Sequence, residues 1–255
     1  AKLKTNDFKP RAFIKRSNVK FIGTTDDPVS SLEYHELLQN DASFDTKIAP
    51  TFRPDGAMFI EKPTFKEWLG KLTAVTGVDV VSLDDLFTAL KVRIDFFAEK
   101  GCSASDHDVQ KLVYREPTKQ EVEAIFNKAL KDDHLTEEEL LSYRWYFLTE
   151  AGKMYAEKQW VMQLHMGAMR NNNTRMKEKI GPDTGFDSIG DQVSAYAISR
   201  FLDHLDQQGL LPRTILFNLN PNDNDILAGM MGNFYEEGIP GKIQFGSAWW
   251  FNDHI

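Results

Sequence analysis

The stretch QLHMGAMRNNNTRM, residues 163–176, carries the side chains in this sequence that are best suited to chemistry. An apolar run, residues 160–162, precedes it and predicts a buried strand that delivers His165 at its C-terminal end. A basic and amide-rich loop that begins at Arg170 follows. A histidine suits metal or proton chemistry, and arginines with asparagines suit an oxygen-rich anion. The alternative is a histidine satisfied in the core and followed by a polar turn.

Two other residues close short apolar segments and are candidates for the same reason. Arg53 follows KIAPTF, residues 47–52, and suits a carboxylate or a sugar hydroxyl, although a structural salt bridge to a nearby aspartate is an equal alternative. His107 ends GCSASDH, residues 101–107. Trp249 lies in a tryptophan pair after the predicted strand 242–246, where it would either stack on a substrate or wall the mouth of a barrel.

The histidines form none of the compact metal motifs. The chain has six, and none belongs to an H-x-H pair, an H-E-x-x-H helix or a Cys/His zinc spacing. A complete metal site is therefore not visible in the sequence.

Composition excludes several classes of protein. The 255 residues carry a net charge of −8, and there is no basic stripe, which argues against a nucleic-acid partner. The single cysteine, Cys102, permits no disulfide within the chain, so a reducing compartment, the cytoplasm, is expected. No apolar run reaches the roughly 18 residues of a membrane span. The N-terminus lacks the apolar region of a signal peptide, and we expect it to be an internal position of a longer protein.

Strand and helix patterns alternate along the chain. Six strands are predicted near residues 19, 47, 101, 161, 214 and 242, and helices are predicted at 31–38, 193–208 and 223–234. The block 64–158 is mainly helical, with capping signals at Ser82-x-x-Asp85 and Thr136-x-x-Glu139. We divide the chain into barrel strands and a helix (1–60), a mainly helical insertion with a short strand near 101–107 (61–158), and further barrel strands and helices (159–255). The pattern predicts an α/β fold with a parallel sheet.

Seven segments resemble, in order, the uronate (glucuronate) isomerases, a family of the amidohydrolase superfamily. They are VKFIGTTDDP, PTFRPD, GCSASDHD, QLHMGAMRNNNTRM, GPDTGFDSIGD, TILFNLNPNDN and GKIQFGSAWWFND, and they span the chain almost from end to end. The resemblance implies a (β/α)8 TIM barrel with helical insertions, of which this chain would supply about strands two to seven. It also implies the bacterial cytoplasm as the location and hexuronate catabolism as the pathway.

The resemblance further implies a reaction and a set of residues. The reaction interconverts D-glucuronate with D-fructuronate and D-galacturonate with D-tagaturonate by moving a proton between C-2 and C-1. Arg53 and His165 would be catalytic, and Trp249, Arg170 and His107 would bind the substrate. His165 is also a candidate ligand of a divalent metal, for which zinc is the default and manganese the second candidate.

Two motifs of the family have no counterpart in this sequence: an H-x-H pair on the first strand and an Asp-x-Arg motif on the last. We therefore expect an internal piece that is inactive alone and does not hold the metal by itself. We expect a hexuronate and further copies of the same chain as partners, but neither nucleic acid nor membrane. The alternatives are a metal-dependent hydrolase of the amidohydrolase type and a non-catalytic sugar-acid binding or assembly module. Flanking H-x-H and T-D-S-R segments would decide among them.

Overall fold

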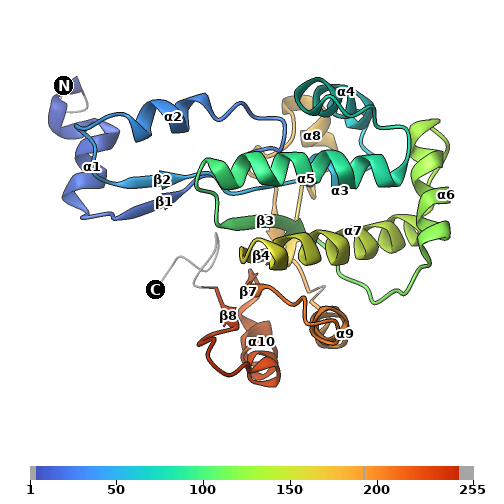
Figure 1. The fold of residues 1–255 in the computed structure, drawn as a ribbon. Coiled ribbons are helices and arrows are strands. Elements are labelled where there is room, and N and C mark those ends of the chain that lie inside the picture. The colour runs from blue at the N-terminus through green and yellow to red at the C-terminus, as the bar shows by residue number, and fades with distance from the viewer. Residues whose placement is uncertain (1–3, 192, 247–255) are drawn as a thin grey trace.

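The computed structural model of the chain describes residues 4–191 and 193–246 (Figure 1). The strands are β1 (Phe21–Gly23), β2 (Lys47–Ala49), β3 (Ala104–Val109), β4 (Val161–Met166), β5 (Ala168–Met169), β6 (Ser188–Ile189), β7 (Arg213–Asn218) and β8 (Ile243–Phe245). The α-helices are α1 (Pro10–Arg16), α2 (Glu33–Gln39), α3 (Asp55–Met58), α4 (Phe65–Thr76), α5 (Leu83–Glu99), α6 (Lys119–Leu130), α7 (Glu137–Glu157), α8 (Thr174–Ile180), α9 (Ala195–Asp206) and α10 (Asn224–Met231). Short 3-10 helices lie at η2 (Asn6–Phe8), η3 (Pro221–Asp223) and η4 (Gly232–Phe234).

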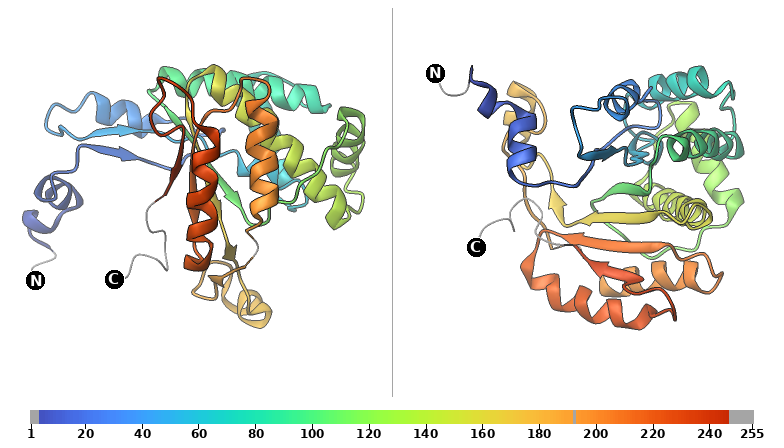
Figure 2. Two further views of the ribbon diagram at one scale, coloured as in Figure 1. Left: turned by 90° about the horizontal axis from the view of Figure 1, so that it is seen from below. Right: turned by 60° about the vertical axis from the view of Figure 1, so that its left-hand side comes forward.

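The six predicted strands all form, and they run parallel. The order of the larger sheet is β3-β4-β7-β8, and β1 pairs with β2 in a second sheet. Single parallel bridges from Phe52 to Asp26 and to Ser105 connect the two sheets. Helices, among them α5, α7, α9 and α10, lie on one side of this run of strands (Figure 2). The prediction of an α/β fold with a parallel sheet is confirmed.

The third strand starts later than its sequence suggests. The pattern predicted it from residue 101, but β3 begins at Ala104. Gly101 has a φ of +85°, a left-handed conformation that ends the turn after α5 and does not belong in a strand.

The block 64–158 is mainly helical, as predicted, and its capping signals are real. Thr136 accepts a hydrogen bond from the backbone N–H of Glu139, whose carboxylate accepts one from the N–H of Thr136. Ser82 likewise caps α5 by accepting from the N–H of Asp85. A second capping box, Thr118 with Glu121 at the start of α6, was missed in the sequence. The proposed division of the chain into three parts stays a prediction.

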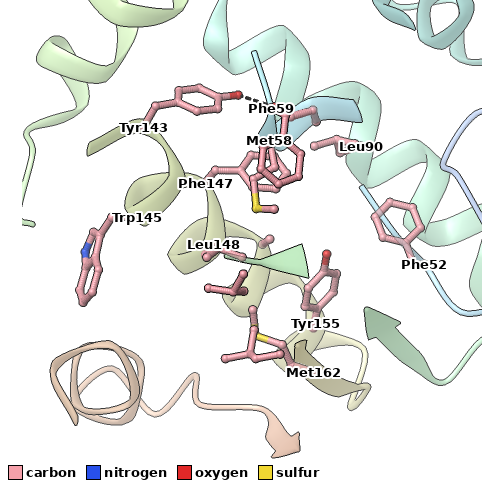
Figure 3. Close-up of a cluster of buried hydrophobic side chains, with 14 of the residues drawn as sticks. Phe52, Met58, Phe59, Leu90, Tyr143, Trp145, Phe147, Leu148, Tyr155 and Met162 are labelled. Atoms are coloured by element: carbon pink, nitrogen blue, oxygen red, sulfur yellow. Dashed lines mark hydrogen bonds between the residues drawn. The ribbon is translucent and has the colours of Figure 1, made fainter. Parts of the chain in front are cut away.

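The core lies between the helices and the sheet (Figure 3). Phe52 is 1% exposed, and its ring lies 5.1 Å from that of Phe97, 6.2 Å from that of Tyr155 and 6.0 Å from that of Trp160. Because this packing occupies one face of the sheet around β3, the alternate side chains of β3 point to the opposite face. Among the described residues, no helix is long and apolar enough to cross a membrane.

The segment after β4 is more ordered than predicted. The sequence predicts a basic, amide-rich loop here. In the structure β5 and β6 form an antiparallel pair, and α8 lies between them in the chain. The Asn173 side chain caps α8 by accepting from the N–H of Met176. Two-residue strands are too short for periodicity to reveal, and α8 has no buried residues that would mark an apolar face.

Both outer strands of the run have an open edge within residues 4–191 and 193–246. There, β1 pairs only with β2 and β8 only with β7, and the side chains of Phe21 and Phe245 are 50% and 37% exposed. Unpaired edges beside apolar side chains favour association. The isolated chain is therefore expected to form oligomers, as light scattering would show. A stable monomer whose β1 and β8 amides exchange rapidly with solvent would contradict this expectation.

Candidate active site

The two faces of β3 carry different chemistry. In the parallel register, Asp106 lies beside Gln163 of β4, and Asp108 lies beside His165. Because side chains alternate along a strand, these four share the face turned away from the helices. A cleft of about 330 Å³ opens on that face, and its lining includes Thr24, Thr51, Asp106, Gln163 and His165.

The Asp106–His165 pair is the centre of the site. The Nδ1 atom of His165 lies 2.6 Å from Oδ1 of Asp106. Burial tends to raise the pKa of the Asp106 carboxyl, but the hydrogen bond from His165 and the neighbouring positive charges hold that pKa below its usual value. An ionised Asp106 accepts the Nδ1 proton and so selects the tautomer in which Nε2 is the basic nitrogen. This arrangement suits either proton transfer or ligation at Nε2.

Arg53 joins this pair through the same carboxylate. Its Nε atom lies 3.5 Å from Oδ2 of Asp106 and 3.1 Å from Oδ2 of Asp55. Arg53 and His165 therefore lie on the same side of the sheet, with β3 between their segments and Asp106 connecting them. Sequence reasoning did not single out Asp106, although it lies in the quoted segment GCSASDHD.

Asp55 is a carboxyl with an unusual pKa. Burial raises this pKa from 3.8 to about 6, against the charge of Arg53 and with repulsion from Asp108 and Asp106. The folded protein thus binds this proton more tightly than the unfolded chain does. Its stabilising contribution is complete below pH 3.8 and is lost as the pH rises through about 6.

Asp55→Asn is expected to remove the loss of stability that accompanies ionisation of the Asp55 carboxyl. The free energy of unfolding of the variant should fall less than that of the parent between about pH 4 and pH 7. Urea denaturation at a series of pH values measures the difference, with Asp133→Asn on the surface as the matched control. An unchanged pH dependence in Asp55→Asn would show that this carboxyl titrates normally.

Arg170 connects the segment after β4 to the site. Its Nε donates to Oδ2 of Asp108 at 3.1 Å, and its Nη1 lies 3.5 Å from Oδ2 of Asp187. Asp187 also accepts from the backbone N–H of Asn171 at 2.7 Å. The guanidinium therefore binds carboxylates of the protein itself, and its predicted contact with substrate stays a prediction.

His107 lies away from the site. It is fully buried on the helix side of β3, where its Nε2 is 3.2 Å from Oγ of Ser105 and its ring centroid is 5.5 Å from that of Tyr155. Burial lowers its pKa to about 3, so the ring is neutral. The interpretation of His107 as a substrate-binding residue does not fit this position, because the alternation of the strand directs it into the core. Trp249 lies outside the described residues.

The donors in the described part of the chain do not complete a metal site. Residues 4–191 and 193–246 contain no group of three or more His, Cys, Asp or Glu side chains arranged to hold a metal ion. His165 is placed to offer one nitrogen, while Asp106 is engaged with Nδ1 of that histidine and with Arg53.

Comparison with known proteins gives a consistent result. A model of the glucuronate isomerase family matches residues 1–255. A uronate isomerase of Halalkalibacterium halodurans is 55% identical over 253 residues, which are 99% of this chain and 54% of that protein. The crystal structure of uronate isomerase from Thermotoga maritima matches with a TM-score of 0.87 at 32% identity, covering 96% of this chain and 52% of that one. Glucuronate isomerase from Caulobacter crescentus matches with a TM-score of 0.86 at 28% identity, over 98% of this chain and 50% of its own.

The matches cover nearly all of this chain but only part of each relative. This chain spans about half the length of the curated relatives it matches.

Proposed function

Because the chain belongs to the glucuronate isomerase family, we propose that it forms about half of an enzyme that interconverts aldo- and keto-hexuronates. The observation that carries the proposal is the row Arg53–Asp106–His165 on the open face of a parallel sheet. We propose further that the six parallel strands are strands two to seven of an eight-stranded (β/α)8 barrel. The carboxyl ends of barrel strands are where such enzymes hold their catalytic side chains.

The proposed reaction moves a proton between C-2 and C-1 of the sugar through an enediol or enediolate. It requires a group that takes and returns a proton and a positive group beside the developing oxyanion. His165, held in one tautomer by Asp106, meets the first requirement at Nε2. Arg53 meets the second, or anchors the carboxylate of the hexuronate, which lies far from the reacting carbons and orients them.

A divalent metal, zinc or manganese, is part of the proposal only as a partner of the complete protein. In a complete site it would supply Lewis-acid stabilisation of the sugar oxygens. His165 is a side chain of the described residues that could ligate it, and the remaining ligands would come from outside those residues. We also propose a bacterial cytoplasmic location and a homo-oligomer, in keeping with the single buried cysteine and the open sheet edges.

A substrate panel tests the function. The product of the full coding sequence is supplied with D-glucuronate, with D-galacturonate and with the matching hexoses, which lack the carboxylate. We expect keto-uronate products from the two uronates and much weaker turnover of the hexoses, because the hexoses lose the anchoring contact. Amide and ester substrates are assayed in parallel. Hydrolysis of these without isomerisation of any hexuronate would replace the proposal with a metal-dependent hydrolase.

A further inference from the structure

The ring of His165 has a second neighbour besides Asp106. Phe217 lies beside His165 in the register of β4 and β7, and the two rings stack face to face. Their centroids are 4.6 Å apart and their planes differ by 8°. The side chain of His165 is 14% exposed and lines the cleft. The Phe217 ring covers one face of its imidazole.

The stack supplies a constraint that the Asp106 carboxylate cannot. A hydrogen bond to Nδ1 fixes the position of one ring atom and the direction of its N–H. Rotation of the imidazole about that direction still tilts the ring plane and changes the direction in which the in-plane lone pair of Nε2 points. A flat aromatic face held parallel to the imidazole fixes the ring plane, so the two contacts together fix the direction of the Nε2 lone pair.

Gly246 in turn keeps Phe217 in place. A β-carbon built at Gly246 would overlap with the Phe217 ring, with Cδ1, Cε1 and Cγ as the nearest atoms. The backbone N–H of Gly246 also donates to the carbonyl of Leu216 at 2.8 Å, which fixes the close approach of the two segments. Only a glycine accommodates the ring at this position.

We propose that Phe217 is a positioning residue that sets the plane of the His165 imidazole, and that Gly246 provides the space its ring requires. The kinetic consequence rests on the function proposed above, whereas the structural claim does not. Phe217 acts through His165: it keeps Nε2 aimed at one point in the cleft, so that proton transfer or ligation there meets a preorganised nitrogen.

Nuclear magnetic resonance tests the structural claim without any assay of activity. In protein labelled at its six histidines, the His165→Gln variant identifies the His165 resonances. A ring stacked under Phe217 should show upfield-shifted Cε1–H and Cδ2–H signals. Phe217→Leu should remove the upfield shift, and Phe217→Tyr, which keeps a flat ring, should retain it. His165 signals that do not move in Phe217→Leu would overturn the proposal.

Kinetics test the consequence in the product of the full coding sequence. Phe217→Leu is expected to lower kcat about 10- to 100-fold with little change in KM, since a misaimed group loses rate rather than substrate affinity. Phe217→Tyr should restore most of the rate. A rise in KM at constant kcat would overturn the positioning role, because it would mean that Phe217 contacts the substrate.

Gly246→Ala tests the same contact from the other side. Its methyl group should displace the Phe217 ring and reproduce both the lost shift and the lower kcat. Gly229→Ala is the matched control, since a β-carbon at Gly229, within α10, has nothing within 4 Å. Should Gly246→Ala fold poorly, the Phe217→Leu and Phe217→Tyr pair still decides. Wild-type His165 signals in a folded Gly246→Ala variant would refute the role of Gly246.

Discussion

Residues 1–255 purified alone are expected to convert no measurable D-glucuronate or D-galacturonate, whereas the product of the full coding sequence converts both. The described part of the chain offers the Asp106–His165 pair and Arg53, but no three-ligand metal cluster. It also spans only 54% of a relative to which it is 55% identical. A barrel site draws its residues from the ends of several strands, so a chain that lacks some of those strands leaves the transition state poorly stabilised.

The comparison needs a proof that the short chain is folded. Circular dichroism and a cooperative urea transition supply it, because the core between the helices and the sheet lies within the described residues. Turnover by the folded short chain at a rate near that of the longer protein would mean that residues 1–255 form a complete active site.

Asp106→Asn in the longer protein is expected to lower kcat by about 10²- to 10⁴-fold. The amide removes the negative charge that selects the Nδ1–H tautomer of His165, and its NH₂ group can donate where the carboxylate only accepts. The same substitution removes one of the two carboxylates that flank Nε of Arg53. Initial rates of keto-uronate formation measure the effect.

Asp133→Asn, an equally charge-removing change on the surface, is the control for this experiment and should leave kcat unaltered. If Asp106→Asn retained the parental kcat while remaining folded, the carboxylate would be structural, and the proposed base would have to be sought elsewhere.

The strands and long helices could be predicted because their signals are local. Periodic apolar residues and capping boxes such as Thr136 with Glu139 specify an element without reference to the rest of the chain. The β5–α8–β6 excursion could not be predicted in this way, because its strands exist only through their pairing with each other. The late start of β3 depends on a left-handed glycine, which the apolar pattern does not reveal.

The residues of the candidate site also differ in whether a local sequence pattern reveals them. Arg53 and His165 were found because each follows an apolar strand, which is a local pattern. Asp106 and His107 are neighbours in one strand, and the choice between them depends on which face of β3 meets the helices. The face that meets the helices depends on the tertiary structure. The sequence alone therefore led to His107 as the candidate site residue, and not to Asp106. Phe217 was missed for the same reason, since its role is visible only in the register of β4 with β7.

Substitution of His165 tests whether this chain carries the proton-transfer residues of a hexuronate isomerase. The product of the full coding sequence and its His165→Asn variant are incubated with D-glucuronate, and the keto-uronate is followed by proton nuclear magnetic resonance. We expect conversion by the parent and a loss of at least about 100-fold in kcat/KM for the folded variant. A parent that isomerises no hexuronate, or a His165→Asn variant as fast as the parent, would contradict it.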